Sequence, residues 1–333
     1  MPKRILLIDP ALHDRSGGAS PNLGDQIISR AVRREIHDLF GGDLDLSRAP
    51  SHAFPGWDIA GKVRDSDCTI VGGSNLLSFH PVRPTSWKIG LPGLAGFRNL
   101  VLMGAGWGSY QTRGNNYGRW VARRILSGSA LHSLRDQYST DQARTSLGLH
   151  GSINTACPTM WRLSSPHLAS IRRSKGAVCL FSLTDYAKDV QQDTALLEML
   201  AKHYAGRLLL WPQGARDLSY VRSLGFQGQA IERSLDSLID TLRTTDGLDY
   251  VGTRLHAGIL CLEHGVRSMI VSVDNRATEI HRDTGLSVIE RSDLAGLAHW
   301  LTHDVSCTLG LPYENIDRWK KSVLRMAEQG GDG

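Results

Sequence analysis

Short apolar runs alternate with amphipathic stretches along most of the chain. Runs at residues 5–8, 68–71 and 208–211 are bounded by turn residues and predict buried strands. Apolar residues spaced by three and four over residues 26–40 predict a helix that ends at a pair of glycines. This alternation is typical of parallel sheets flanked by helices, so we predict an α/β fold.

The same pattern continues to the C-terminus. The predicted strands are residues 5–8, 68–71, 100–103, 131–134, 177–183, 208–211, 249–251, 268–273 and 287–289. The predicted helices are residues 26–40, 120–126, 137–147, 190–204, 235–242, 254–264, 278–284, 292–302 and 316–326.

A proline- and serine-containing basic stretch interrupts the alternation at residues 158–176, which we interpret as a linker. It separates an N-terminal Rossmann-like domain at residues 1–157 from a C-terminal one at residues 177–310. A helix and tail follow at residues 311–333. Two consecutive α/β halves of this kind predict two Rossmann-like domains that face a cleft.

Composition excludes several classes of protein. With 41% hydrophobic and 21% charged residues the chain is globular rather than disordered. The net charge of +5 comes without a basic run interleaved with aromatics, so we expect no nucleic-acid partner. Five scattered cysteines lack CxxC spacing, and His299 and His303 have no third ligand in view, so we expect neither a disulfide framework nor a metal site.

We also expect a cytoplasmic protein. Residues 5–8 form too short an apolar run for a signal peptide, and no run reaches the length of a membrane span. The helix at 316–326 places cations opposite an apolar face. We predict that it packs across the two domains, with peripheral contact to the inner membrane as the alternative.

The clearest chemistry follows the predicted strand 249–251. Ligands of parallel α/β sheets bind beyond the carboxyl ends of the strands. Here Thr253, Arg254, Leu255 and His256 open a helix, whose N-terminus carries free N–H groups and partial positive charge. A cation and an imidazole at such an end predict a phosphate or carboxylate site, with His256 placed to move a proton.

Other strand ends carry weaker signals. Arg135 and Asp136 follow strand 131–134 and provide either an anion contact or an internal ion pair. Asn22 and Asp25 precede the first helix, as a capping turn or as groups that hold a sugar hydroxyl.

Two glycine-containing turns leave further alternatives. Gly73, Ser74 and Asn75 allow close approach of a ligand to the backbone, or form a simple turn. The turn around Trp107 lacks the third glycine of GxGxxG, so we expect no dinucleotide site. Trp107 itself either stacks on a sugar or packs in the core.

Five ordered motifs together resemble the polysaccharide pyruvyl transferases over about residues 5–290. The motifs are Asn22-Leu23-Gly24-Asp25, Gly72-Gly73-Ser74-Asn75, Ser133-Leu134-Arg135-Asp136, Gly252-Thr253-Arg254-Leu255-His256-Ala257 and Asp274-Asn275-Arg276. The chain departs from the family at Cys157, where many members have aspartate before proline, and at Arg276, where lysine is usual.

The resemblance implies a GT-B-like pair of Rossmann-like domains, with the acceptor on the N-terminal side and the donor on the C-terminal side. It also implies transfer of pyruvate from phosphoenolpyruvate to sugar hydroxyls as a ketal, without cofactor or metal, in cell-surface or extracellular polysaccharide synthesis. The implied catalytic residues are Arg135, Arg254 and His256, and the donor-binding set adds the backbone N–H of Leu255 and the side chain of Arg276. We assign Asn22, Asp25, Gly73, Ser74, Asn75 and Trp107 to the acceptor. The acceptor is expected to be a carbohydrate, with lipid-linked and nucleotide-linked forms as alternatives.

Two alternatives stay open from the sequence. A nucleotide-sugar glycosyltransferase of GT-B type would need an acidic residue for a ribose, for which Glu290 and Asp293 are the candidates. A non-catalytic carbohydrate-binding relative would have kept the fold and lost turnover. The cysteine at position 157 keeps that alternative open, while the intact Arg135, Arg254 and His256 argue against it.

Overall fold

The computed structural model describes residues 2–77, 87–110 and 116–330, and its contacts divide the chain into two compact units. Unit 1 comprises Met1–Ser20, Ile28–Trp161 and Leu311–Gly333. Unit 2 comprises Pro21–Ile27 and Arg162–Gly310. The boundary between Trp161 and Arg162 therefore lies inside the predicted linker at residues 158–176, and the C-terminal helix belongs to unit 1.

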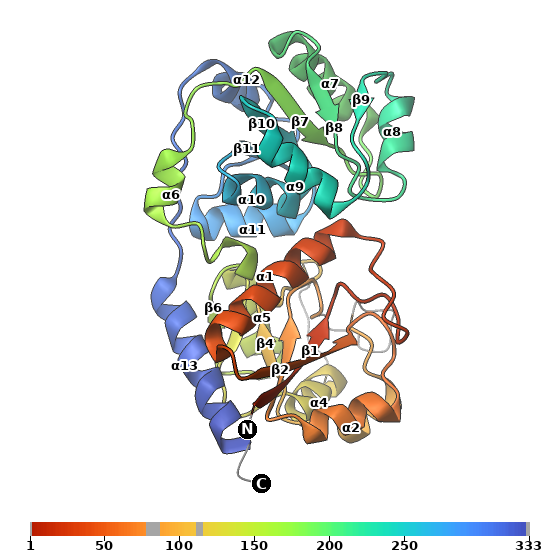
Figure 1. Cartoon of the computed structure of the whole chain (residues 1–333), viewed down its shortest axis with the longest axis vertical. Coiled ribbons are helices and arrows are strands. Elements are labelled where there is room, and N and C mark those ends of the chain that lie inside the picture. Colours follow the sequence, from red (N-terminus) through yellow and green to blue (C-terminus); the bar gives the residue numbers. More distant parts are fainter. Residues whose placement is uncertain (1, 78–86, 111–115, 331–333) are drawn as a thin grey trace. The chain divides into compact units, whose positions relative to one another are not determined.

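Unit 1 is built from parallel strands and flanking helices (Figure 1). Its strands are β1 (Lys3–Asp9), β2 (Leu44–Pro50), β3 (Cys68–Gly72), β4 (Val101–Met103), β5 (His132–Leu134) and β6 (Ser152–Asn154). Its helices are α1 (Leu23–Phe40), whose first turn groups with unit 2, α2 (Trp57–Asp65), α3 (Gly90–Gly96), α4 (Asn116–Ile125), α5 (Gln137–Leu147), the 3-10 helix η1 (Pro158–Met160) and α13 (Tyr313–Gly330). The main sheet has the order β2-β1-β3-β4.

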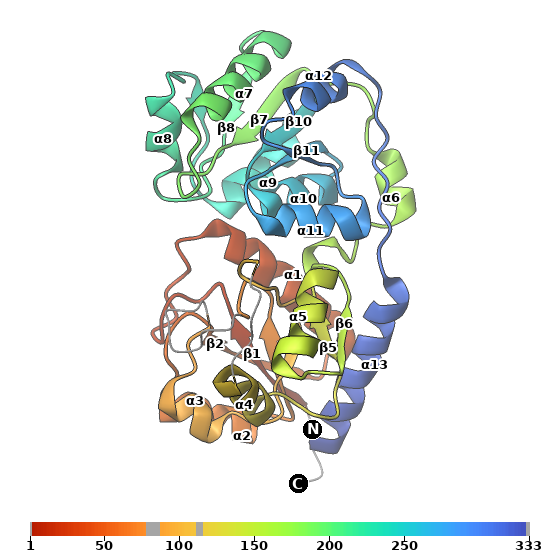
Figure 2. The same ribbon diagram turned by 180° about the vertical axis from the view of Figure 1, so that it is seen from behind.

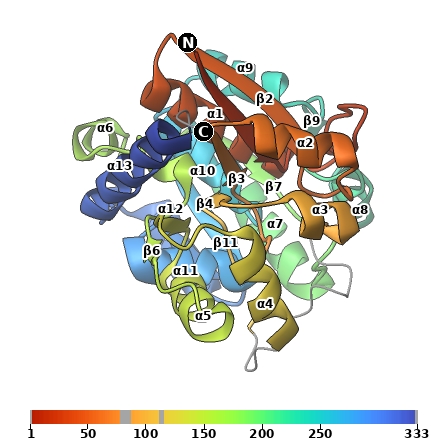
Figure 3. The same cartoon turned by 90° about the horizontal axis from the view of Figure 1, so that it is seen from below.

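The core of unit 1 follows the two-residue period of its strands. Leu6 and Ile8 pack among apolar side chains of α2 and α4, whereas Ile5 and Leu7 pack among those of α1 and α13. Successive side chains of a strand point to opposite faces, so both faces of β1 are buried. Strands β5 and β6 pair with each other, and α5 packs beside them (Figures 2 and 3).

Helix α13 is part of the unit 1 core. Ile316, Trp319 and Val323 are buried there, and the Trp319 indole N–H donates to the carbonyl of Leu102 at 3.0 Å. The apolar face of this helix is therefore covered by protein rather than presented to lipid. Within the described ranges, no helix combines the length and hydrophobicity that a bilayer span requires.

Unit 2 contains one parallel sheet in the order β12-β11-β10-β7-β8-β9. Its strands are β7 (Val178–Ser182), β8 (Leu208–Leu210), β9 (Gln229–Ala230), β10 (Leu248–Gly252), β11 (Arg267–Ser272) and β12 (Val288–Glu290). Its helices are α6 (Ser165–Ser170), α7 (Val190–His203), α8 (Asp217–Ser223), α9 (Leu235–Thr244), α10 (Leu255–Glu263), α11 (Asn275–Thr284) and α12 (Leu294–Thr302). Figure 2 labels the helices α7, α8 and α12 of this unit. Their apolar side chains share a core with Phe181, Val251 and Val271.

The predicted α/β class with parallel sheets flanked by helices is confirmed. Several short elements were missed, among them β2, β6 and α8. Helix α8 has seven residues, too few for a helical period to stand out from its surroundings. Because every strand of unit 2 is parallel, the loops after β7, β8, β10 and β11 all leave from one edge of the sheet, which we call the carboxyl edge.

Candidate functional site

The turn between β10 and α10 is held tightly to the neighbouring strand. A Cβ atom at Gly252 would lie 2.5 Å from the Ser182 carbonyl oxygen, so only glycine fits there. The Thr253 N–H donates to that same carbonyl at 2.9 Å, and the Tyr250 hydroxyl donates to the Arg254 carbonyl at 3.1 Å. These contacts place Arg254 at the N-cap position of α10, with the extended φ and ψ of −100° and 96°.

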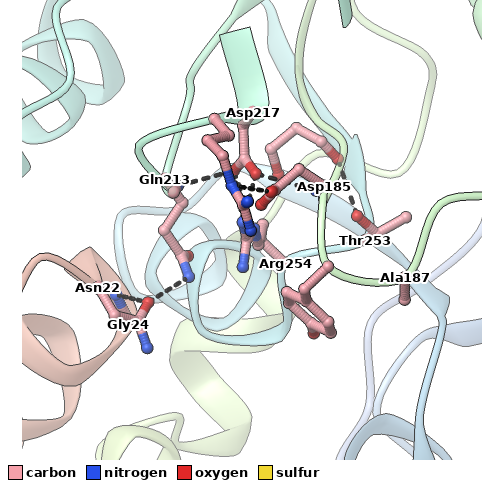
Figure 4. Close-up of polar contacts among 12 residues, drawn as sticks. Asn22, Gly24, Asp185, Ala187, Gln213, Asp217, Thr253 and Arg254 are labelled. Atoms are coloured by element: carbon pink, nitrogen blue, oxygen red, sulfur yellow. Dashed lines mark hydrogen bonds and ion pairs between the residues drawn. The ribbon is translucent and has the colours of Figure 1, made fainter. Parts of the chain in front are cut away.

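The Arg254 guanidinium forms a bidentate ion pair with Asp217 (Figure 4). Its Nε lies 3.1 Å from Oδ2 of Asp217, and its Nη2 lies 2.5 Å from Oδ1 and 2.6 Å from Oδ2. Asp217 is completely buried and Arg254 is 7% exposed. A bidentate arginine–carboxylate pair fixes the plane of the guanidinium as well as its position.

Asp217 is itself held by two backbone donors. The N–H of Gly214 donates to Oδ2 at 2.7 Å, and the N–H of Asp185 donates to Oδ1 at 3.1 Å. A Cβ atom at Gly214 would lie 2.6 Å from Nη2 of Arg254, so glycine at this position leaves room for the Arg254 side chain. Sequence reasoning missed Asp217, and the only local signal was the Gln213-Gly214 pair just beyond β8.

Tyr186 lies between two arginines at the carboxyl edge. Its ring centroid is 5.1 Å from Cζ of Arg254 and 5.9 Å from Cζ of Arg276, distances typical of cation–π contacts. The Arg276 guanidinium donates to the Tyr186 hydroxyl at 2.6 Å and pairs with Asp274, which also accepts from that hydroxyl. Tyr186 is 50% exposed and was not predicted from the sequence.

Arg276 keeps its charge in this setting. Burial alone would lower the pKa of Arg276, but the hydrogen bonds to Asp274 outweigh that effect and raise the pKa. Asp274 also accepts from the Arg276 backbone N–H and so caps α11. Arg254 and Arg276 thus both place guanidinium groups at the carboxyl edge of unit 2.

His256 belongs to the first turn of α10, two residues after Arg254. Its side chain is buried, as is that of Leu255. Among the described residues no side chain caps the start of α10, and a helix N-terminus with a cation beside it favours an anion. The predicted grouping of a cation, an imidazole and a helix N-terminus therefore exists within this single turn.

Asn22 and Asp25 form a capped turn at the start of α1. The Asn22 side-chain oxygen accepts from the Gly24 N–H at 3.1 Å, and its amide nitrogen donates to Asp25 at 3.1 Å. Within unit 2, the Gln213 amide donates to Asn22 at 3.2 Å (Figure 4). The capping alternative thus describes the local geometry, with the Gln213 amide as a further partner of Asn22.

The sequence of this chain matches the model of one protein family over residues 22–275. That family is described as polysaccharide pyruvyl transferase, and the match includes both Arg135 and the turn with Arg254 and His256. The chain belongs to the polysaccharide pyruvyl transferase family. No curated protein matches it.

Solved structures of the wall teichoic acid polymerase TagF show a distant likeness to this pyruvyl transferase family member. One, soaked with CDPG, gives a TM-score of 0.42 at 11% identity and covers 100% of this chain and 84% of that chain. A second TagF structure gives a TM-score of 0.39 at 10% identity, with the same coverage. Scores this low do not establish a common fold.

In unit 1 of this pyruvyl transferase family member, Arg135 follows β5 and is 2% exposed. Its Nε donates to Asp136 at 3.0 Å and its Nη2 to the Trp107 carbonyl at 3.3 Å. A Cβ atom at Gly106 would lie 2.2 Å from Cζ of Arg135, so a glycine admits this guanidinium too. Asp136 also caps α5 through the Ser139 N–H, which matches the ion-pair alternative for these two residues.

The glycine turn after β3 has unusual backbone geometry. Gly73 and Ser74 both have φ of 62°, and a Cβ atom at Gly73 would lie 2.2 Å from Cγ2 of Ile28. Positive φ at a non-glycine residue is uncommon and concentrates at ligand sites. The Asn75 side-chain oxygen is buried without a hydrogen-bond partner among the described residues.

The structure also places four other positions that the sequence singled out. Trp107 is completely buried in the unit 1 core, in agreement with its core-packing alternative. A sugar cannot stack on its ring, because the ring is not exposed to solvent. Cys157 is a buried thiol whose pKa burial raises, and it accepts a hydrogen bond from Thr159. Asp293 caps α12 by accepting from the Gly296 N–H at 2.8 Å, while Glu290 is exposed.

Metal ligands are not grouped in the parts of the chain that the structure describes. No set of three histidine, cysteine or acidic residues there has the geometry of a metal site. The rings of His299 and His303 stack with centroids 4.1 Å apart at the end of α12. The carboxyl edge of unit 2 instead groups cationic side chains, among them Arg254 and Arg276.

Proposed function

We propose that this protein transfers pyruvate from phosphoenolpyruvate to two hydroxyl groups of a sugar, forming a ketal and releasing phosphate. The observation that carries the proposal is the turn that opens α10. There Arg254, His256 and a helix N-terminus lie together at a carboxyl edge, inside the region that matches the family. We further propose that the product belongs to cell-surface or extracellular polysaccharide synthesis.

The donor is a small dianion or trianion with a carboxylate and a phosphate. Arg254 and the first N–H groups of α10, including that of Leu255, are suited to one of these groups. Arg276 adds a second permanent charge at the same edge, and Arg135 is proposed as a further donor-binding residue. Because phosphoenolpyruvate is a cytoplasmic metabolite, the proposed reaction takes place in the cytoplasm.

The proposed chemistry begins with a proton added to the methylene carbon of the donor. The central carbon then becomes cationic, and one sugar hydroxyl attacks it and loses its proton. The bond from this carbon to the phosphate oxygen breaks, phosphate leaves, and the second hydroxyl closes the ketal with loss of its own proton. Guanidinium groups stabilise the charge that develops on the departing phosphate.

His256 is the proposed proton donor. A helix N-terminus and the nearby Arg254 both disfavour a charged imidazole. A bound donor with several negative charges would favour the imidazolium form, so we propose that protonation of His256 accompanies donor binding. The position of this residue beside Arg254 in the same turn supports the assignment.

The acceptor is proposed to meet Asn22, Asp25, Gly73, Ser74 and Asn75. Asp25 would hold a sugar hydroxyl or accept its proton, while the strained turn at Gly73 and Ser74 would bring backbone close to the sugar. Trp107 is not retained in this set because it is completely buried. The carbohydrate is proposed to be free, lipid-linked or nucleotide-linked.

Donor binding and turnover test the proposal together. We expect phosphoenolpyruvate to raise the melting temperature of the protein, and Arg254→Ala to weaken binding so that the shift disappears at a donor concentration that saturates the wild type. Phosphate release, followed by ³¹P NMR, should require both phosphoenolpyruvate and one member of a panel of galactose, mannose and glucosamine acceptors. Stabilisation by a nucleotide sugar alone would contradict the proposal, and donor binding without phosphate release would indicate a non-catalytic relative.

The role of His256 is tested by comparing it with Arg254. We expect His256→Gln to lower turnover by about a hundredfold or more while donor affinity changes much less, since general acid catalysis contributes on this scale. The measurements are kcat from phosphate release and the dissociation constant of phosphoenolpyruvate. If His256→Gln kept near-full turnover while Arg254→Ala lost it, His256 would be a ligand contact rather than the proton donor.

A further inference from the structure

We propose that Asp217 is a positioning residue that orients Arg254 for the donor, an inference that rests on the proposed function. Asp217 begins α8 and has no place in the motifs that the sequence offered. It is 37 residues from Arg254 along the chain, yet its carboxylate accepts three hydrogen bonds from that guanidinium. Asp217 acts through Arg254 and does not touch the donor.

The geometry leaves one side of the guanidinium for a ligand. Asp217 occupies Nε and Nη2, while Nη1 of Arg254 has no hydrogen-bond partner among the described residues. The Tyr186 ring lies 5.1 Å from Cζ of Arg254, beside the guanidinium. A guanidinium held by one edge and contacted by a ring can present its remaining nitrogen in only a narrow range of directions.

The Asp217 carboxylate is itself held by hydrogen bonds from two neighbouring loops. The N–H of Asp185 comes from the loop after β7, and the N–H of Gly214 comes from the loop after β8. Arg254 comes from the loop after β10, and β10, β7 and β8 are neighbours in the sheet. Asp217 therefore joins three adjacent loops of the carboxyl edge, and a cation fixed in this way loses little further freedom when an anion binds.

Charge and orientation make opposite predictions for the removal of this carboxylate. The negative charge of Asp217 opposes the attraction between Arg254 and an anion. If charge alone mattered, Asp217→Asn would strengthen donor binding. If orientation matters, the same substitution weakens binding, because asparagine replaces one of the two acceptor oxygens with an NH₂ group that faces the donors of Arg254 and a backbone N–H.

A double-mutant cycle measured with phosphoenolpyruvate separates these outcomes. We expect Asp217→Asn to weaken the affinity, measured by calorimetry, by about tenfold or more. In the Arg254→Ala background the same substitution should change the affinity less than about twofold, because Asp217 has no cation left to orient. Tighter binding by Asp217→Asn, or equal effects in the two backgrounds, would overturn the inference.

Asp249→Asn is the matched control. Asp249 is also a completely buried carboxylate that accepts from an arginine in unit 2, but it lies near the start of β10. Its substitution should lower the melting temperature and leave the affinity of the folded protein for phosphoenolpyruvate within about twofold. A loss of affinity equal to that of Asp217→Asn would mean that any disturbed buried carboxylate has this effect, and the inference would fail.

A measurement without the donor keeps the inference distinct from the proposed function. In ¹⁵N NMR, the Nε–H of Arg254, assigned with Arg254→Lys, should exchange slowly with water in the wild type and rapidly in Asp217→Asn. Slow exchange in a protein that fails to bind phosphoenolpyruvate would refute the proposed function and leave the positioning intact. Equal exchange in the two proteins would refute the positioning, and Asp217→Glu serves in the same test if Asp217→Asn does not fold.

Discussion

The sheet of unit 2 carries a buried aspartate–arginine pair near each of its two edges, and the surroundings of the two pairs differ. At the start of β10, Asp249 accepts from Arg172, from Tyr204 and from the Gly176 N–H. Arg267 lies 3.5 Å from Asp249, and its guanidinium stacks 3.5 Å from the centroid of the Trp300 ring. We call this group the amino-edge cluster.

Beyond the end of β10, the pair of Asp217 and Arg254 forms the carboxyl-edge cluster with Tyr186 and Arg276. The two clusters use the same ion-pair chemistry, yet Tyr204 is completely buried at the amino edge while Tyr186 is half exposed at the carboxyl edge. Asp217 and Asp249 are both completely buried, so burial of the carboxylate alone does not separate the two clusters. The aromatic neighbours of the cations differ in exposure: Tyr186 beside Arg254 is 50% exposed, whereas Trp300 beside Arg267 is 3% exposed.

Arg254→Lys should have the largest effect and should separate function from stability. Lysine keeps the charge but cannot make the bidentate pair with Asp217. We expect kcat/KM for phosphoenolpyruvate to fall by about a hundredfold to a thousandfold. The free energy of unfolding in urea should fall by only about 1–2 kcal/mol.

One outcome would contradict this prediction. If Arg254→Lys unfolded the protein but kept the activity of the folded fraction, the carboxyl-edge cluster would be structural. Its role would then be the same as that of the amino-edge cluster.

Asp249→Asn should give the reverse result. Loss of the charge leaves Arg172 and Arg267 without their buried partner, and broken buried pairs cost on the order of 3 kcal/mol. Urea unfolding should show this loss, while kcat/KM of the folded protein should stay within about threefold of the wild type. A large fall in kcat/KM without loss of stability would place the amino-edge cluster in the reaction.

A matched pair of tyrosine substitutions should give the smallest effects. Tyr204→Phe removes the hydroxyl that donates to Asp249 at 2.7 Å and should cost about 1–2 kcal/mol of stability, with donor affinity unchanged. Tyr186→Phe keeps the ring beside Arg254 but removes the contacts to Asp274 and Arg276. We expect roughly threefold weaker donor binding and almost no change in unfolding free energy.

Calorimetry with phosphoenolpyruvate and urea unfolding on both variants provide the test. Equal changes in stability for the two tyrosines would show that exposure does not separate the clusters.

Much of the carboxyl edge was predictable because its motifs are local. The buried run at 249–251, the glycine after it and the polar start of the next helix all lie within a few residues of one another. The structure places that strand at Leu248–Gly252 and that helix at Leu255–Glu263. Asp217 and Tyr186 escaped prediction because Asp217 begins a short helix and Tyr186 lies in a loop, where no periodic pattern marks a residue.

Trp107 is a residue that the sequence assigned to the acceptor and that the structure places in the core. A tryptophan in a glycine-rich turn suggested a surface for a sugar, and its core-packing alternative was equally open. The structure buries it completely among the side chains of the unit 1 core. Local sequence does not reveal which large aromatic side chains are covered, because their coverage comes from segments distant in the chain.

By itself, the sequence determined the α/β class, the family and the turn that brings Arg254 and His256 together, since strand period, helix capping and motif spacing are all local properties. Only the tertiary structure decided what holds Arg254. Its partner Asp217 reaches it because β10, β7 and β8 are neighbours in the sheet, and strand order is set by long-range packing rather than by any local pattern. The same packing placed the buried Trp300 ring against Arg267 in the amino-edge cluster. It left Tyr186 half exposed beside Arg254 in the carboxyl-edge cluster.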